Sequence, residues 1–305
     1  MSLAGLRPQA SFLTATLLLA AAVWLPPVTL QRPTWRYVVT FDLTQSMDVP
    51  DQRLGGMPVS RLAMSRAAAR EALQRLPCGS QLGWSVFADY RVMLLATPVE
   101  VCAHHEELLA ALEAIDGRMR WADASKVGKG ASWVVRTARA LDPPARVVFL
   151  TDGHESPPLR SASESPPVQD LVPGEIGGWL IGVGGDLPQR IPRSDDEGRE
   201  IGHWDAADVV QRSSRAAPGT DHEHLSELRE THLRGLGELL GLGYRRLSRP
   251  SDLADAMLDP ALVTREPVAT DLRWLPALLA LAVLVLRFLP EGPGLRWRWR
   301  HRRPT

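Results

Sequence analysis

Cysteine and lysine are both scarce in this chain of 305 residues. Two cysteines are too few for a small fold held by several disulfides, or for a cysteine-rich zinc module. Lys126 and Lys129 are the only lysines, so arginine carries almost all of the positive charge. The 35 basic residues are balanced by 35 acidic ones, which excludes the basic surface of a general nucleic-acid-binding protein. We therefore expect no nucleic-acid partner.

Long hydrophobic runs are also few, and the mean hydropathy is −0.11. This value excludes a membrane protein with many spans but leaves room for one or two. Hydrophobic residues make up 45% of the chain and charged residues 23%, which excludes a disordered chain. The length allows one large domain or two of ordinary size.

The first of two apolar segments is residues 1–31. No charged residue occurs between Arg7 and Arg32, and a bilayer core of about 30 Å needs about 20 apolar residues as a helix. We expect this segment to be a membrane anchor. A cleaved signal peptide is the alternative, because the alanines at 20–22 would suit a signal peptidase.

The second apolar segment, residues 273–290, is expected to be a transmembrane helix whose Arg287 reaches toward the membrane surface. A juxtamembrane connector at 251–272 precedes it. The basic tail at 291–305 follows it, and the positive-inside rule places that tail in the cytoplasm. A buried helix with a solvated tail is the alternative.

With both anchors in a bacterial inner membrane, the middle of the chain would lie in the periplasm. This compartment is oxidising, and it permits a disulfide between Cys78 and Cys102. Two buried thiols are the alternative.

Residues 32–250 alternate strand-like apolar runs with amphipathic helical runs. This alternation predicts an α/β domain with a doubly wound, mostly parallel sheet and helices on both faces. A hairpin signal at residues 88–91 predicts one antiparallel edge strand. The segment near 186–223 has many charges and no sustained period, so we expect a long insertion. The expected strands are 36–41, 82–87, 92–96, 146–151, 178–183 and 244–247, and the expected helices are 61–76, 106–115, 130–141 and 225–240.

Side chains with oxygen atoms follow two of these strands and precede one helix. In open α/β sheets, ligands bind beyond the carboxyl ends of the strands. Asp42, Thr44, Ser46, Ser125 and Asp152 would form an oxygen-only set there, which suits a hard cation. We expect Mg²⁺ first, with Ca²⁺ and Mn²⁺ as alternatives. No catalytic group is predicted, because Ser46 has no evident histidine and aspartate partners for a hydrolase triad.

These residues resemble the metal-ion-dependent adhesion site of the von Willebrand factor A (vWA) domain. The matching motifs are Asp42-x-Thr44-x-Ser46, Ser125-x-Val127 and Thr151-Asp152-Gly153. Thr44 stands where a serine is commoner and Ser125 where a threonine is commoner, but both keep a hydroxyl. The resemblance covers roughly residues 35–250 and implies a vWA, Rossmann-like fold. A vWA fold with a metal-free site is the alternative.

Nearly the whole chain also resembles the MxaL family of methanol-oxidation accessory proteins. That family is associated with periplasmic methanol dehydrogenase, a calcium-carrying PQQ enzyme, and is implicated in its maturation, notably calcium insertion. The resemblance implies an accessory protein that is not an enzyme. The segments that carry it are LPCGS at 76–80, VEVCAH at 99–104, LTDGHE at 150–155, GVGG at 182–185, EHLS at 223–226 and DLRWL at 271–275.

The expected partners are methanol dehydrogenase or its assembly proteins, other vWA proteins and a MoxR-type ATPase, at the inner membrane. His154 and Glu155, which follow the metal aspartate, are candidates for partner binding. One alternative is a metallochaperone that itself hands calcium to the enzyme. Another is a BatA-like vWA protein that serves a MoxR-type ATPase in a stress response or in general complex assembly.

Overall fold

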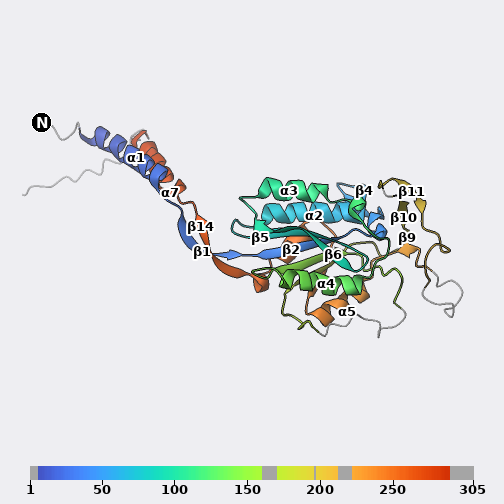
Figure 1. Ribbon diagram of the computed structural model, residues 1–305. Helices are drawn as coiled ribbons and strands as arrows, with labels where there is room; N and C mark the ends of the chain where they lie inside the picture. Colours follow the sequence, from blue (N-terminus) through green and yellow to red (C-terminus); the bar gives the residue numbers. More distant parts are fainter. Residues whose placement is uncertain (1–5, 160–169, 196, 212–221, 289–305) are drawn as a thin grey trace, which may run out of the picture. The chain divides into compact units, whose positions relative to one another are not determined.

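The computed structural model describes residues 6–159, 170–195, 197–211 and 222–288, and Figure 1 shows their helices and strands. The chain divides into two compact units. One is Arg32–Glu266, and the other combines Met1–Gln31 with Pro267–Thr305. All the residues of the expected metal site belong to the first unit.

A six-stranded sheet forms the centre of the larger unit, in the order β13-β8-β7-β2-β5-β6. Neighbouring strands from β13 to β5 are parallel, and β6 pairs antiparallel with β5 at one edge. The prediction of an α/β fold with a mostly parallel sheet is confirmed. The strands are β2 (Arg36–Asp42), β5 (Gln81–Ala88), β6 (Arg91–Glu100), β7 (Arg146–Thr151), β8 (Gly178–Gly182) and β13 (Gly243–Arg246).

The side chains of the central strands divide between two cores, because successive residues of a strand point to opposite faces of the sheet. In β7, Val148 and Leu150 belong to the core on one face, and Val147 and Phe149 to the core on the other. Since both faces are covered, such strands read as continuous apolar runs in the sequence.

Helices cover both faces of the sheet, with α2 and α3 on one side and α4 and α5 on the other (Figure 1). Ser60 caps α2, since its hydroxyl accepts a hydrogen bond from the N of Ala63. Gly130 lets α4 approach the sheet, because a Cβ there would lie 2.2 Å from a ring atom of Phe87. These helices are α2 (Arg61–Arg75), α3 (His105–Ala114), α4 (Val127–Arg139), α5 (Glu230–Leu240) and α6 (Ser251–Met257).

The expected insertion contains short strands where it is described. β10 (Pro192–Ser194) pairs with β11 (Glu200–His203), and β9 (Gln189–Arg190) pairs with β12 (Leu225–Ser226). The prediction of a helix from residue 225 is therefore wrong at its start, because Leu225 and Ser226 pair with a strand and α5 begins at Glu230. The remaining short elements are β3 (Gln52–Leu54), β4 (Met57–Val59) and the 3₁₀ helices η1 (Gln45–Asp48), η2 (Gly117–Met119) and η4 (Pro260–Leu262).

The smaller unit contains α1 (Leu6–Trp24) and α7 (Trp274–Phe288), and the rings of Phe12 and Phe288 lie 6.1 Å apart. In the part of the chain that the structure describes, no helix is long and apolar enough to cross a membrane. The transmembrane helices predicted within 1–31 and 273–290 are therefore not supported.

Two predicted boundaries fall differently in the structure. Residues 28–31, placed in the N-terminal anchor, belong to β1 (Val28–Thr34), which pairs with β14 (Thr264–Thr270). The predicted connector begins at 251, yet α6 lies within the core of the larger unit, so that unit continues to Glu266. The basic tail at 291–305 lies outside the described residues.

Cys78 and Cys102 form a disulfide, with 5.3 Å between their Cα atoms. Glu100 ties the same two turns together, because its carboxylate accepts hydrogen bonds from the N of Gly79 at 2.6 Å and the N of Ala103 at 2.5 Å. Burial alone would raise the pKa of Glu100, but these backbone hydrogen bonds hold that pKa below its usual range. The turn after α2 is thus joined to the end of β6 by the disulfide and by the hydrogen bonds of Glu100.

Candidate functional site

The five predicted metal-site residues lie at the carboxyl edge of the sheet. Asp42 ends β2, Thr44 follows it at the cap of η1, and Ser46 lies within η1. Asp152 comes directly after β7, and Ser125 precedes α4. Because β2 and β7 are parallel neighbours, their carboxyl ends open at the same edge. All five residues are buried.

Asp42 is held by hydrogen bonds to both of its oxygens. Oδ1 accepts from the N of Thr44 at 2.9 Å and from its Oγ1 at 2.7 Å. Oδ2 accepts from the Oγ1 of Thr151 at 2.6 Å. Burial is the larger cause, and the negative charge of Asp152 the next, that together raise the pKa of Asp42 to about 7. The hydrogen bonds to Asp42 act in the opposite direction and lower that pKa. A cation beside the two carboxylates would relieve this repulsion.

Asp152 is paired with a buried arginine. Arg61 Nη1 donates to Oδ2 of Asp152 at 2.6 Å, and the Oγ of Ser226 donates to the same oxygen at 2.8 Å. Oδ1 accepts from the N of His154 at 2.9 Å. Burial alone would raise the pKa of Asp152, but the charge of Arg61 holds that pKa below its usual range. Asp152 is therefore a carboxylate at neutral pH.

Arg61 also joins this aspartate to the first metal loop. It donates to the backbone O of Ser46 at 3.3 Å and, through Nη2, to Oδ2 of Asp51 at 2.6 Å. Sequence reasoning missed Arg61. One signal was present: a positive charge at the first residue of a helix is unfavourable, because the positive end of the helix dipole lies there. Such a charge needs a partner elsewhere in the fold.

Ser125 is fixed through its backbone. Its N donates to the O of Ser156 at 2.7 Å, and its O accepts from the N of Ser156 at 2.7 Å. Its buried Oγ has no hydrogen-bond partner among the residues that the structure describes. A buried hydroxyl without a hydrogen-bond partner costs free energy of folding. The Oγ of Ser125 is therefore suited to bind a ligand.

The residues present fit a hard divalent cation. The set consists of two carboxylates and three hydroxyls, all buried, with the hydroxyl of Ser125 unpaired. The hydroxyl oxygens of Thr44 and Ser46 lie 3.4 Å apart. Asp42, Thr44, Ser46, Ser125 and Asp152 are the residues that would hold the ion. Arg61 lies beside this set and already balances the negative charge of one of its carboxylates, that of Asp152.

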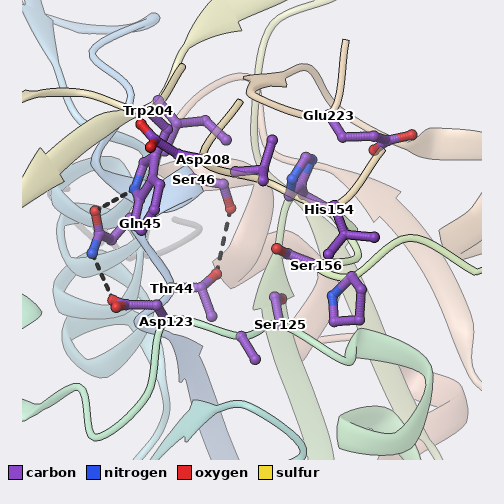
Figure 2. Close-up of a pocket in the computed structure, with 15 residues that line it drawn as sticks. Thr44, Gln45, Ser46, Asp123, Ser125, His154, Ser156, Trp204, Asp208 and Glu223 are labelled. Atoms are coloured by element: carbon purple, nitrogen blue, oxygen red, sulfur yellow. Dashed lines mark hydrogen bonds between the residues drawn. The ribbon is translucent and has the colours of Figure 1, made fainter. Parts of the chain in front are cut away.

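A cavity of about 260 Å³ opens onto these hydroxyls (Figure 2). His154, a predicted partner-binding residue, lines the cavity and is only 3% exposed. Burial lowers the pKa of His154, against the opposing charge of Asp152. Its Nδ1 has no hydrogen-bond partner within the described part of the chain. This ring nitrogen is therefore a buried polar atom without a partner among the described residues.

Glu155, the other predicted partner-binding residue, does not line the cavity. Its Oε1 accepts a hydrogen bond from the N of Gly128 at 2.7 Å and lies 3.1 Å from Nε2 of His232. These contacts reach α4 and α5. Glu155 therefore connects the loop after β7 to α4 and α5.

Gln45, between two predicted metal ligands, is a second residue that sequence reasoning missed. Its Oε1 accepts from Nε1 of Trp204 at 2.7 Å and from the N of Ser194 at 3.3 Å, and its Nε2 donates to Asp123 Oδ1 at 2.7 Å. Figure 2 shows the bridge from Trp204 through Gln45 to Asp123. The insertion is therefore fastened to the metal loop. No sequence signal identified these contacts, because they join residues 149 and 159 positions apart.

No family model matches the chain, and no curated protein sequence matches it. Several solved structures are similar to the chain at low identity. An aerotolerance-related membrane protein from Bacteroides fragilis NCTC 9343, with multiple mutations to serines, is 16% identical over 73% of this chain and 96% of that one, with a TM-score of 0.49. The conserved hypothetical protein BatB from Bacteroides thetaiotaomicron is also 16% identical, over 73% of this chain and 97% of that one, with a TM-score of 0.49.

A von Willebrand factor type A structure from Catenulispora acidiphila is 13% identical over 83% of this chain and 50% of that one, with a TM-score of 0.41. Because these three TM-scores are below 0.5, no argument rests on the likeness. The comparisons give no support for membership of the MxaL family or for a role in methanol oxidation.

Proposed function

We propose that this chain is a non-enzymatic binding protein that uses a divalent cation to hold a carboxylate of a protein partner. The observation that carries the proposal is the buried hydroxyl of Ser125, which is unpaired among the described residues and borders the cavity beside Thr44 and Ser46. A bound divalent cation would supply a coordination position for an oxygen of the partner. Mg²⁺ is the first expectation, and Ca²⁺ and Mn²⁺ are the alternatives.

The charges around the site support the binding of a divalent cation. Asp42, Asp152 and Asp51 supply three carboxylates, and Arg61 offsets only one of these charges. A divalent cation would balance the other two. Because electrostatic interactions are strong where water is excluded, a partner carboxylate would be attracted to the cation itself at an open coordination position.

We propose the periplasmic side of the bacterial inner membrane as its location. The disulfide between Cys78 and Cys102 supports an oxidising compartment. Leu13 and Leu17 of α1 and Leu278 and Leu281 of α7 are each more than half exposed, which supports contact with lipid.

The finer role that we propose is assistance in the maturation or calcium loading of methanol dehydrogenase. This proposal rests on the sequence resemblance alone, which includes the segments at 76–80 and 150–155. Its partners would be methanol dehydrogenase or its assembly proteins, together with other vWA proteins and a MoxR-type ATPase. A general assembly or stress role with a MoxR-type ATPase is the alternative, and normal growth on methanol of a strain lacking this protein would favour it.

The test is a pull-down from membranes of methanol-grown cells, with Mg²⁺ or with EDTA. Wild type should capture a partner only with Mg²⁺, and Asp42→Ala should capture none. Asp170→Ala is the control, because Asp170 is exposed and pairs with Arg136 on the surface. Capture that ignores both the metal and Asp42 would overturn the proposal of a metal-bridged contact.

A further inference from the structure

A second cavity, of about 250 Å³, lies at the opposite edge of the sheet, where the parallel strands begin. Arg36, the first residue of β2, and Arg146, the first residue of β7, both line it. The two strands are parallel neighbours, and Tyr37 pairs with Arg146 in their register. The fold therefore brings two positive charges to one cavity, at the amino edge of the sheet rather than at the metal loops.

Neither arginine of the second cavity forms an ion pair within the described part of the chain. Both are partly buried. Nε of Arg36 donates to the O of Pro143 at 3.1 Å. The guanidinium of Arg146 has no hydrogen-bond partner among the described residues, and a Cβ at Gly177 would lie 3.2 Å from its Nη1. Most of the N–H groups of these two guanidiniums are thus left for a ligand or for water.

The electrostatic surroundings of Arg36 also favour an anion. Burial lowers the pKa of Arg36, although the negative charges of Glu266 and Asp142 act to raise it. The surface residue Arg136 shows the opposite result, because its hydrogen bonds to Asp170 raise its pKa. The cost of burying the charge of Arg36 is therefore not offset by its acidic neighbours. An anion bound in the second cavity would offset it.

Two glutamates also line the second cavity, and they restrict the kind of anion. Glu175 lies 3.5 Å from Arg139, which offsets its charge. The carboxylate of Glu266 has no ion pair or hydrogen bond with any described residue. Two positive charges and one negative charge are thus left without a close partner. This set predicts a ligand that carries an anionic group and, a short distance away, a cationic group.

We propose that the second cavity binds an aminoalkyl phosphate, with the phosphate at Arg36 and Arg146 and the ammonium beside Glu266. Arginine suits the phosphate, because its planar fork of N–H groups matches two phosphate oxygens. Phosphoethanolamine and the headgroup of phosphatidylethanolamine share this chemistry. The inference does not depend on the proposed function, because none of the five expected metal-site residues lines this cavity.

The experiment is calorimetry on the full chain in a maltoside detergent with EDTA, so that divalent cations at the other edge take no part. The ligands are phosphoethanolamine, inorganic phosphate, ethanolamine and dihexanoylphosphatidylethanolamine. We expect phosphoethanolamine to bind at least about tenfold more tightly than phosphate or ethanolamine, because it alone of these three meets charges of both signs. Equal or tighter binding of the short-chain lipid would identify a lipid headgroup as the source, and weaker binding a free phosphomonoester.

Two variants locate the site. Arg146→Gln should weaken phosphoethanolamine binding by about tenfold or more, and it should fold because this guanidinium has no hydrogen-bond partner among the described residues. Glu266→Gln should weaken phosphoethanolamine binding and leave phosphate binding unchanged. Arg70→Gln and Glu113→Gln are the matched controls, because these two side chains pair with each other at 2.7 Å on the surface and do not line the second cavity. Both controls should bind as wild type does.

Three outcomes would overturn the inference. If phosphoethanolamine does not bind, the second cavity is not a site for an aminoalkyl phosphate. If phosphate binds as tightly as phosphoethanolamine, the ammonium contributes nothing and the ligand class is wrong. If Arg146→Gln keeps the full affinity, the ligand binds elsewhere. A separate Mg²⁺ titration without EDTA tests the proposed function, so failure of one leaves the other standing.

Discussion

Nη1 of Arg61 lies 2.6 Å from Oδ2 of Asp152, and neither side chain has any exposed surface. The same guanidinium contacts Asp51 through Nη2 at 2.6 Å. A buried charge pair of this kind contributes little net stability compared with apolar residues, but loss of one partner leaves the other charge without compensation. Arg61 is therefore a structural cation beside the residues that we propose as metal ligands.

Replacement of Arg61 by methionine should reduce the free energy of unfolding by about 3–5 kcal/mol, because it leaves two buried or nearly buried carboxylates without a partner. Urea unfolding measures this loss. Arg75→Ala is the control, and it should cost less than about 1 kcal/mol, because Arg75 forms only surface ion pairs. Added Mg²⁺ should stabilise Arg61→Met more than wild type, since the variant site is more negative. Wild-type stability of Arg61→Met would contradict the assigned role.

Ser125→Ala should weaken Mg²⁺ binding without destabilising the fold. The Ser125 hydroxyl is unpaired among the described residues, so its removal takes away a desolvation cost and no hydrogen bond within the protein. The control is Ser85→Ala, because the Ser85 hydroxyl lies 2.7 Å from that of Thr40 and is far from the metal loops in sequence. Ser85→Ala should cost about 1 kcal/mol in unfolding and leave Mg²⁺ affinity unchanged. Calorimetry and urea unfolding separate the two effects, and unchanged affinity in Ser125→Ala would remove Ser125 from the ligand set.

Glu100→Gln should show a pH-dependent loss of stability. The pKa of Glu100 is lowered in the folded chain, so its stabilising effect is present above the ordinary pKa of about 4.3 and is lost as the pH falls through the folded value. At about pH 7 the variant should lose about 1 kcal/mol, because two backbone donors lose a charged acceptor. Below the lowered pKa of the folded chain, the variant and wild type should unfold alike. Glu113→Gln is the exposed control, and a loss independent of pH would argue against the charge of Glu100 as the cause.

Gln45→Leu should loosen the attachment of the insertion to the loop that contains Thr44 and Ser46. The substitution removes the acceptor of Trp204 Nε1 and of Ser194 N, and it removes the donor to Asp123. Amide hydrogen exchange should therefore become faster in residues 189–205, by about tenfold or more for a lost local free energy near 1.4 kcal/mol. Gln81→Leu is the control, because Gln81 begins β5 away from this segment. Equal exchange in Gln45→Leu and wild type would show that other contacts hold the insertion.

The sheet and the metal loops could be predicted because their signals are local. Residues 147–150 of β7 are all apolar, since both faces of this strand are covered, and polar residues follow directly. The start of α5 could not be predicted in this way. Leu225 and Ser226 continue a helical pattern in the sequence, but they pair with β9, and that choice depends on a partner strand more than thirty residues away.

The electrostatic partner of Asp152 could not be predicted either. Arg61 lies 91 positions from Asp152 in the sequence. The chain has many arginines, and no local pattern indicates which of them pairs with this aspartate. The polar loops define which oxygens are available, whereas the folded chain defines which of them are already paired. The difference matters for Asp152, whose charge is offset by Arg61, and for Ser125, whose hydroxyl lacks a partner among the described residues.

The hydrogen bonds of Gln45 separate the residues of the site into those where a substitution would break contacts and those where it would not. Gln45 belongs to the metal loop and also anchors Trp204, so a substitution there would disturb both together. Val209 and Val210 contact the cavity from the insertion and contribute no metal ligand. A descendant of this chain could therefore exchange these valines without changing any of the five buried oxygen-bearing residues at the carboxyl edge of the sheet.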